Sequence, residues 1–89
     1  MNRERRKDLS AIIERISALQ EDLNAILEDL EQIRDDEEEY RDNIPENLQT
    51  SVKYDKAEFA CDALESACDA LSEIDLDEVI CSINQAIEP

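Results

Sequence analysis

The hydrophobic residues between positions 9 and 33 recur at alternating intervals of three and four residues. This spacing is the a/d pattern of a heptad repeat, and it predicts one long amphipathic helix with an apolar stripe along one face. The a and d residues are Leu9, Ile12, Ile16, Leu19, Leu23, Ile26, Leu30 and Ile33, with Leu9 taken as position a. Ile13 and Leu27 each follow a d position and widen the stripe.

A second stripe of small apolar residues predicts another helix in the second half of the chain. Its members are Ala57, Ala60, Cys61, Leu64, Ala67, Cys68, Leu71 and Ile74. The phase then slips by about two residues, and a last stripe contains Leu76, Val79, Ile80, Ile83 and Ile87. Asp75 followed by Glu78 has the form of a helix N-cap. Two alternatives remain: the helix continues with a distortion near residues 74–77, or a short third helix begins there.

Pro45 separates the two helical regions, because proline lacks an N–H donor and disfavours helical backbone at Ile44. We therefore predict a first helix over about residues 3–42, a connection over 43–52 and a second helical region over about 53–88. Thr50 or Ser51 is a suitable N-cap for the second region. The chain has no glycine, which disfavours the tight turns that a sheet requires. The expected fold is all-α, a single domain made of an antiparallel helical hairpin.

The antiparallel arrangement places apolar residues opposite one another, for example Ile12 opposite Ile83 and Leu30 opposite Leu64. Two helices cannot cover the whole apolar surface, and we expect Ile13, Leu27 and a flank of alanines to stay exposed. Exposed apolar stripes of this kind mark interfaces. We therefore expect a homodimer in which two chains form a helical bundle.

The net charge is −16 among 89 residues, with nine basic and 25 acidic side chains. Four of the basic residues cluster at the start (Arg3, Arg5, Arg6 and Lys7), and none lies between residues 57 and 89. This charge disfavours direct binding to nucleic acid or to an anionic membrane and favours basic partners. The charged start is unlike a signal peptide, and no segment is apolar enough to span a membrane. Three cysteines within helical patterns favour free thiols in a reducing cytosol.

The residue types argue against catalysis and against a bound cofactor or metal. Histidine is absent, so no imidazole can activate a cysteine or complete a bundle metal site. Cys61 and Cys68 lie two helical turns apart, about 10 Å, which is too far for a disulfide or one zinc ion. We expect the cysteines to be small packing residues and the protein not to be an enzyme.

From Leu9 onward, every f position of the first helix carries a carboxylate, namely Glu14, Glu21, Glu28, Asp35 and Asp42. Ordinary solvated helices mix both charge signs, whereas here like charges follow one another. The candidate partner-binding residues are Glu21, Asp22, Glu28, Asp29, Asp35, Asp36, Glu37, Glu38 and Glu39, with Tyr40, Ile44 and Leu48 as apolar anchors. The alternative is that these acids only face water, because f positions are solvated in any coiled coil.

The segment from Glu37 to Gln49, with its Asn-Ile-Pro-Glu-Asn-Leu-Gln turn, resembles a motif in small acidic two-helix proteins of phages and prophages. The segments Ala63–Ala67 and Ala70–Ile74 are similar to the second helix of those proteins. The resemblance covers most of residues 9–74 and implies a helical hairpin of mobile-element origin. It implies no defined activity.

Three functional hypotheses follow. The first is a non-enzymatic phage protein in the host cytosol that inhibits a host nuclease or defence component, for example a CRISPR protein. It does so by presenting a nucleic-acid-like acidic surface to a basic surface of its target. The second is a structural homo-oligomeric bundle whose acids only maintain solubility. The third, which the available residue types support least, is a small-ligand binder at the interface between protomers.

Overall fold

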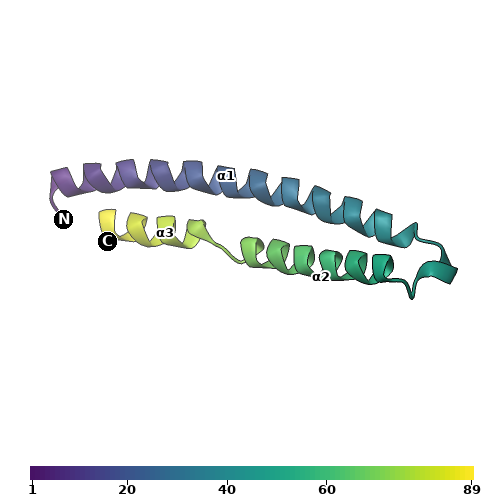
Figure 1. Cartoon of the computed structure of the whole chain (residues 1–89). Coiled ribbons are helices and arrows are strands. Elements are labelled where there is room, and N and C mark those ends of the chain that lie inside the picture. The colour runs from purple at the N-terminus through teal and green to yellow at the C-terminus, as the bar shows by residue number, and fades with distance from the viewer. The chain divides into compact units, whose positions relative to one another are not determined.

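The computed structural model describes all 89 residues and contains helices and no strand (Figure 1). The helices are α1 (Arg3–Asp42), α2 (Val52–Ser72) and α3 (Leu76–Ile87), with a 3-10 turn, η1 (Glu46–Leu48), between α1 and α2. The all-α prediction is confirmed. The helical region predicted over 53–88 is interrupted at Glu73–Asp75, so of the two alternatives the structure has the short third helix.

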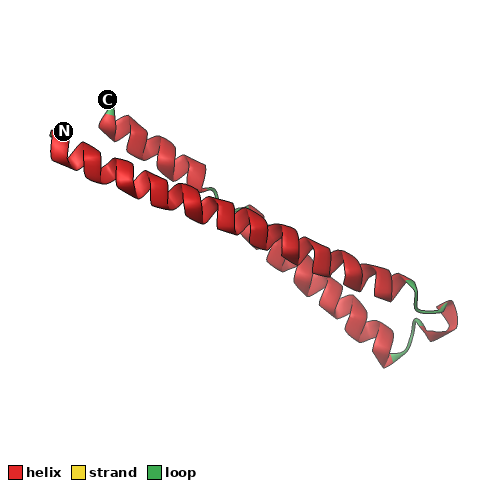
Figure 2. Cartoon of the chain, turned by 90° about the horizontal axis from the view of Figure 1, so that it is seen from above, coloured by secondary structure: helices red, strands yellow, loops and turns green.

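The chain divides into two compact units. Unit 1 contains Met1–Ala25 and Ile74–Pro89, and unit 2 contains Ile26–Glu73. Within unit 1, α3 lies antiparallel beside the N-terminal part of α1, and within unit 2, α2 lies antiparallel beside the C-terminal part (Figures 1 and 2). Unit 2 is therefore a helical hairpin, and unit 1 joins two segments that are far apart in the sequence.

The connection between α1 and α2 reverses the chain without any residue at positive φ. The Ile44 N–H donates to the Arg41 carbonyl at 3.1 Å, and Pro45 then adopts an extended conformation with φ −56° and ψ 144°. The Leu48 N–H donates to the Pro45 carbonyl at 2.8 Å and closes the 3-10 turn. Of the two predicted caps, Ser51 is the one used, and its hydroxyl accepts the Tyr54 N–H at 3.3 Å.

The face of α1 that packs within the chain differs from the predicted a/d face. The half-buried residues of α1 fall mainly on a and e positions: Leu9, Ile13, Ile16, Gln20, Leu23, Leu27, Leu30, Arg34, Glu37 and Arg41. Ile13 and Leu27, which we expected to be exposed, thus belong to the packing face. The d residues are exposed instead: Ile12 (40%), Leu19 (51%), Ile26 (53%), Ile33 (56%) and Tyr40 (43%).

The physical reason lies in the side chains opposite α1. In unit 2, α2 presents Ala57, Cys61 and Cys68, which are at most 3% exposed. These small residues leave room for the long stems of Arg34 and Arg41, which lie near Cys68 and Cys61 respectively. Arginine covers apolar surface with its methylenes while its guanidinium stays near water. Polar residues at e positions are therefore compatible with packing against α2, and the d residues of α1 face solvent.

In unit 1 the polar residue among the half-buried e positions is Gln20, and its side chain caps the N-terminus of α3. The Gln20 side-chain oxygen accepts the Leu76 N–H at 3.2 Å. The Asp75 carboxylate accepts the next two amides, from Asp77 at 3.0 Å and Glu78 at 3.4 Å. The first N–H groups of a helix have no partner inside the helix, and here two side chains satisfy three of them. The predicted Asp75 cap is confirmed, and Gln20 explains why the chain can restart a helix at Leu76.

We predict that Asp75→Ala destabilises the protein by about 1 kcal/mol, because an N-cap carboxylate is lost. For a domain of this size the midpoint of thermal unfolding should fall by about 4–8 °C. Helical circular dichroism during heating measures the change. Asp62→Ala, an exposed site within α2, is the matched control and should have little effect. Equal losses in both variants would show that the cap does not hold α3.

Candidate protein-binding surfaces

Most of the exposed acidic residues of α1 form two neighbouring rows. We define the f row as Glu14, Glu21, Glu28, Asp35 and Asp42, and the g row as Asp22, Asp29 and Asp36. All eight residues are exposed. From Glu14 to Asp36 the two rows hold about one carboxylate per 5 Å of helix axis, compared with one phosphate per about 3.4 Å along a DNA strand. The density of negative charge is thus of the same order as that of nucleic acid.

Few of these carboxylates are neutralised within the chain. Asp35, Glu38 and Asp42 are the only ones of the 25 that form ion pairs. Arg34 lies 3.1 Å from Asp35 and 4.0 Å from Glu38, and Arg41 lies 3.1 Å from Asp42. Every pair lies within α1.

The two arginines remain fully charged in these positions. A hydrogen bond from the guanidinium to Asp35 is the main cause that raises the pKa of Arg34, and a hydrogen bond to Asp42 raises the pKa of Arg41. Burial of the side chains acts in the opposite direction and is outweighed. Asp35 and Asp42 therefore contribute less to a partner surface than the unpaired members of the f row.

The five-acid run Asp35–Glu39 does not lie on one face. Asp35, Asp36 and Glu39 are exposed, whereas Glu37 and Glu38 are half-buried on the side of α1 that faces α2. A helix turns by about 100° per residue, so consecutive residues point around its circumference. The run consequently divides between the partner surface and the packing face.

The three predicted apolar anchors also differ from one another. Tyr40 is 43% exposed, and the Lys53 ammonium lies 5.5 Å from the centre of its ring. Leu48, in η1, is 49% exposed. Ile44 is only 8% exposed and belongs to the core of unit 2. Tyr40 and Leu48 are thus accessible to a partner, and Ile44 is not.

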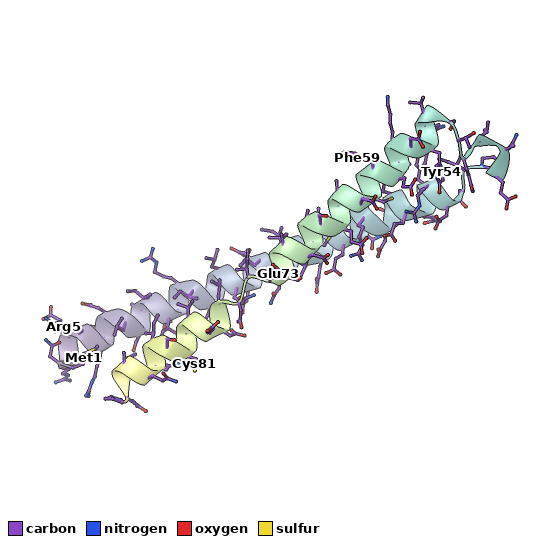
Figure 3. The ribbon with its side chains drawn as sticks, turned by 90° about the horizontal axis from the view of Figure 1, so that it is seen from below. Met1, Arg5, Tyr54, Phe59, Glu73 and Cys81 are labelled. Atoms are coloured by element: carbon purple, nitrogen blue, oxygen red, sulfur yellow. The ribbon has the colours of Figure 1, made fainter.

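Exposed apolar residues form a second candidate surface that our sequence reasoning did not identify. We define the d row as Ile12, Leu19, Ile26, Ile33 and Tyr40, which are seven residues apart and lie on one face of α1. An open depression of about 460 Å³ between two of its members is lined by Ile12, Arg15, Ile16 and Leu19. On α2, Phe59 is 76% exposed and projects into solvent (Figure 3). The sequence did not indicate that the d row would be exposed. The e positions carry the polar residues Gln20, Arg34 and Arg41, and these are compatible with a/d packing because long side chains are common at the edge of coiled-coil faces.

The cysteines divide into two kinds. Cys61 and Cys68 are buried, whereas Cys81 on α3 is exposed (Figure 3). Burial is the main cause that raises the pKa of the Cys61 thiol, and the nearby Glu37 and Glu38 raise it further, against the opposing effect of Arg41. A thiol with a raised pKa is a poor nucleophile at neutral pH. No group of three or more Cys, Asp or Glu side chains is placed to hold a metal ion, and no helix is long and apolar enough to cross a membrane.

Comparisons with protein-family models, with curated proteins and with solved structures gave no match to this chain.

We predict that one thiol of the native protein reacts rapidly with a disulfide reagent at pH 8 and that all three react after unfolding in urea. The fast thiol is Cys81, and Cys81→Ser should remove the fast phase. Rapid reaction of two or three native thiols would contradict the packing of Cys61 and Cys68.

The raised pKa of Cys61 also makes the stability of the fold depend on pH. The protonated thiol contributes stability below its ordinary pKa of 9.0, and that contribution is lost as the pH rises through the higher pKa of the folded state.

Proposed function

We propose that this protein binds a basic surface of another protein and thereby prevents that surface from binding nucleic acid. The observation that supports the proposal is the f row together with the g row. These carboxylates are exposed on a regular helix, and six of the eight form no ion pair. A folded helix holds the charges at fixed spacing, which reduces the conformational entropy lost on binding.

Three residues of the f row, Glu14, Glu21 and Glu28, form the centre of the proposed surface. They are free of ion pairs, and they repeat at about 10 Å intervals along the helix axis. Asp22, Asp29 and Asp36 of the g row and the exposed Glu39 extend the charge, and Tyr40 and Leu48 offer apolar contacts at its end. Complementary charge of this kind accelerates association and sets orientation more than it sets final affinity.

The partner class follows from the charge and from the resemblance of the Glu37–Gln49 segment to small acidic phage proteins. It is a host nuclease or defence component whose nucleic-acid-binding groove is rich in lysine and arginine. The protein acts as a non-enzymatic inhibitor in the host cytosol, a nucleic-acid mimic of the anti-CRISPR or anti-restriction kind. Blocking a groove requires only binding, so no catalytic group is needed.

The test starts by retaining host proteins on the immobilised chain and continues with one purified captured protein. We predict that its complex with this protein weakens about tenfold or more between 50 and 200 mM salt, because charge pairing releases bound counterions. We also predict that the complex competes with nucleic acid for the captured protein. Fluorescence anisotropy with a labelled oligonucleotide measures both effects. Binding that is insensitive to salt, or that leaves the oligonucleotide bound, would overturn the proposal.

Paired charge reversals locate the surface. Glu21→Lys with Glu28→Lys should weaken binding of the captured protein at least about tenfold, as expected for the loss of several charge contacts. Glu58→Lys with Glu65→Lys on α2 is the matched control, since both residues are exposed, seven residues apart and change the net charge equally. Equal effects of the two pairs would show that only the net charge matters and that the f row is not a specific surface.

A second function, a homo-oligomeric structural module, is supported by a different observation, namely the exposure of the d row. This function needs no acidic contact. It predicts self-association that the Glu21→Lys and Glu28→Lys reversals leave intact.

A further inference from the structure

The d row is an unpartnered apolar face on a helix that already packs through another face. Five large side chains, between 40% and 56% exposed, repeat every seven residues from Ile12 to Tyr40. The next d position toward the N-terminus is Arg5, at the start of α1 (Figure 3). Regular seven-residue spacing is what a second helix requires in order to follow the row along its length.

The charges at the two ends of α1 indicate what covers this row. Arg3, Arg5, Arg6 and Lys7 are exposed and form no ion pair. Near the other end of the helix, Asp36 and Glu39 are exposed and also unpaired. One end of the helix is therefore basic and the other acidic, with the apolar row between them. A second α1 in the antiparallel direction complements this pattern, whereas a parallel copy places like charges together.

We propose that the d row binds the d row of a second copy of this chain in the antiparallel direction. The register places Arg5 opposite Tyr40, Ile12 opposite Ile33, and Leu19 opposite Ile26. The unit 1 portion of α1 in one copy then contacts the unit 2 portion of α1 in the other. Because the arrangement is two-fold symmetric, the same contact forms twice.

The neighbouring residues support this register. Arg5 meets the exposed face of Tyr40, a favourable geometry for a cation and an aromatic ring, with Asp36 one turn away on the partner helix. Arg15, which lines the open depression between Ile12 and Leu19, comes opposite Asp29 of the second copy. In antiparallel pairs the g positions face one another on the same side. Asp22 consequently faces Asp22 of the other copy near the symmetry axis, and Asp8 faces Asp36 toward each end. These like-charge contacts are the unfavourable ones, and Arg5 and Arg6 lie beside the second pair.

The dimer leaves the centre of the acidic surface free. Positions d and f are separated by about 160° around a helix, so Glu14, Glu21 and Glu28 point away from the second copy. The g row, in contrast, flanks the dimer contact, and Tyr40 is covered by it, so in the dimer Leu48 is the apolar residue left at the end of the acidic surface. Self-association and binding of a basic partner through the f row are therefore compatible and can be tested separately.

The first test is the mass in solution of the full chain at 0.15 M salt, where charges further apart than about 8 Å are screened. Sedimentation equilibrium should give a dimer that dissociates as the protein is diluted. Leu19→Glu and Ile26→Glu should each give a monomer with unchanged helical circular dichroism, since both sites are exposed. Phe59→Glu, an exposed apolar site outside the d row, should remain dimeric. A wild-type chain that is still monomeric at about 100 µM has a dimer dissociation constant above about 0.1 mM, and this result overturns the proposal. A dimer that only Phe59→Glu disrupts also overturns it.

The second test fixes the direction and register through disulfide formation. In a Cys81→Ser background, one chain carries Ile12→Cys and another carries Ile33→Cys. Each single variant should stay uncrosslinked under mild oxidation, and their mixture should give the mixed disulfide, because only opposing positions bring the Cα atoms within about 7 Å. Cys61 and Cys68 are buried and do not compete. Efficient crosslinking of Ile12→Cys with itself indicates a parallel pair and overturns the proposal.

The Asp22 contact at the symmetry axis gives a third test, in which the substitution should strengthen the dimer and not weaken it. Asp22→Asn should tighten the dimer several-fold, because it removes two like charges that face each other. Glu14→Gln removes the same amount of charge from the f row and is the matched control, for which we expect a smaller change. Equal dissociation constants for the two variants would contradict the register.

Discussion

The structure depends on how the small residues of α2 pack against α1. Ala57, Cys61 and Cys68 are the most deeply buried side chains of the chain. Their size permits Arg34 and Arg41 to lie against them, so α1 uses its a and e positions for packing within the chain. Once those positions are occupied, the d row has to face outward. In unit 2, the exposure of Ile26, Ile33 and Tyr40 is thus a consequence of which face of α1 the small residues accept.

The same choice determines the electrostatic surface. With a and e directed inward, the f row and the g row point away from the packing face and stay in water. Arg34 and Arg41 are directed inward and neutralise only their neighbours on α1, so the central acids of the f row remain unpaired. One helix therefore carries three distinct faces: a packing face, an apolar row and an acidic surface. The proposed functions each use a different one of the two free faces.

The interruption at Glu73–Asp75 has an analogous cause. The phase slip in the apolar pattern means that one straight helix could not keep both Leu71 and Ile83 against α1. The chain instead ends α2 and starts α3 with a new phase, and Asp75 and Gln20 satisfy the amides that this break exposes. The Gln20 contact joins residues 56 positions apart in the sequence, so it also ties α3 to α1 within unit 1.

The sequence by itself determined the all-α class, the end of α1 before Pro45 and the Asp75 cap, because these follow from local periodicity and backbone chemistry. It also identified the acidic rows, since f and g positions face water whichever neighbouring face packs. Only the tertiary structure decided between a/d and a/e packing, because that choice depends on the side chains opposite α1, which in unit 2 are the small residues Ala57, Cys61 and Cys68. It likewise decided that Ile44 is buried and that the Asp35–Glu39 run is divided between two faces. Heptad spacing defines which residues share a face, and the partner's side chains decide which face is covered.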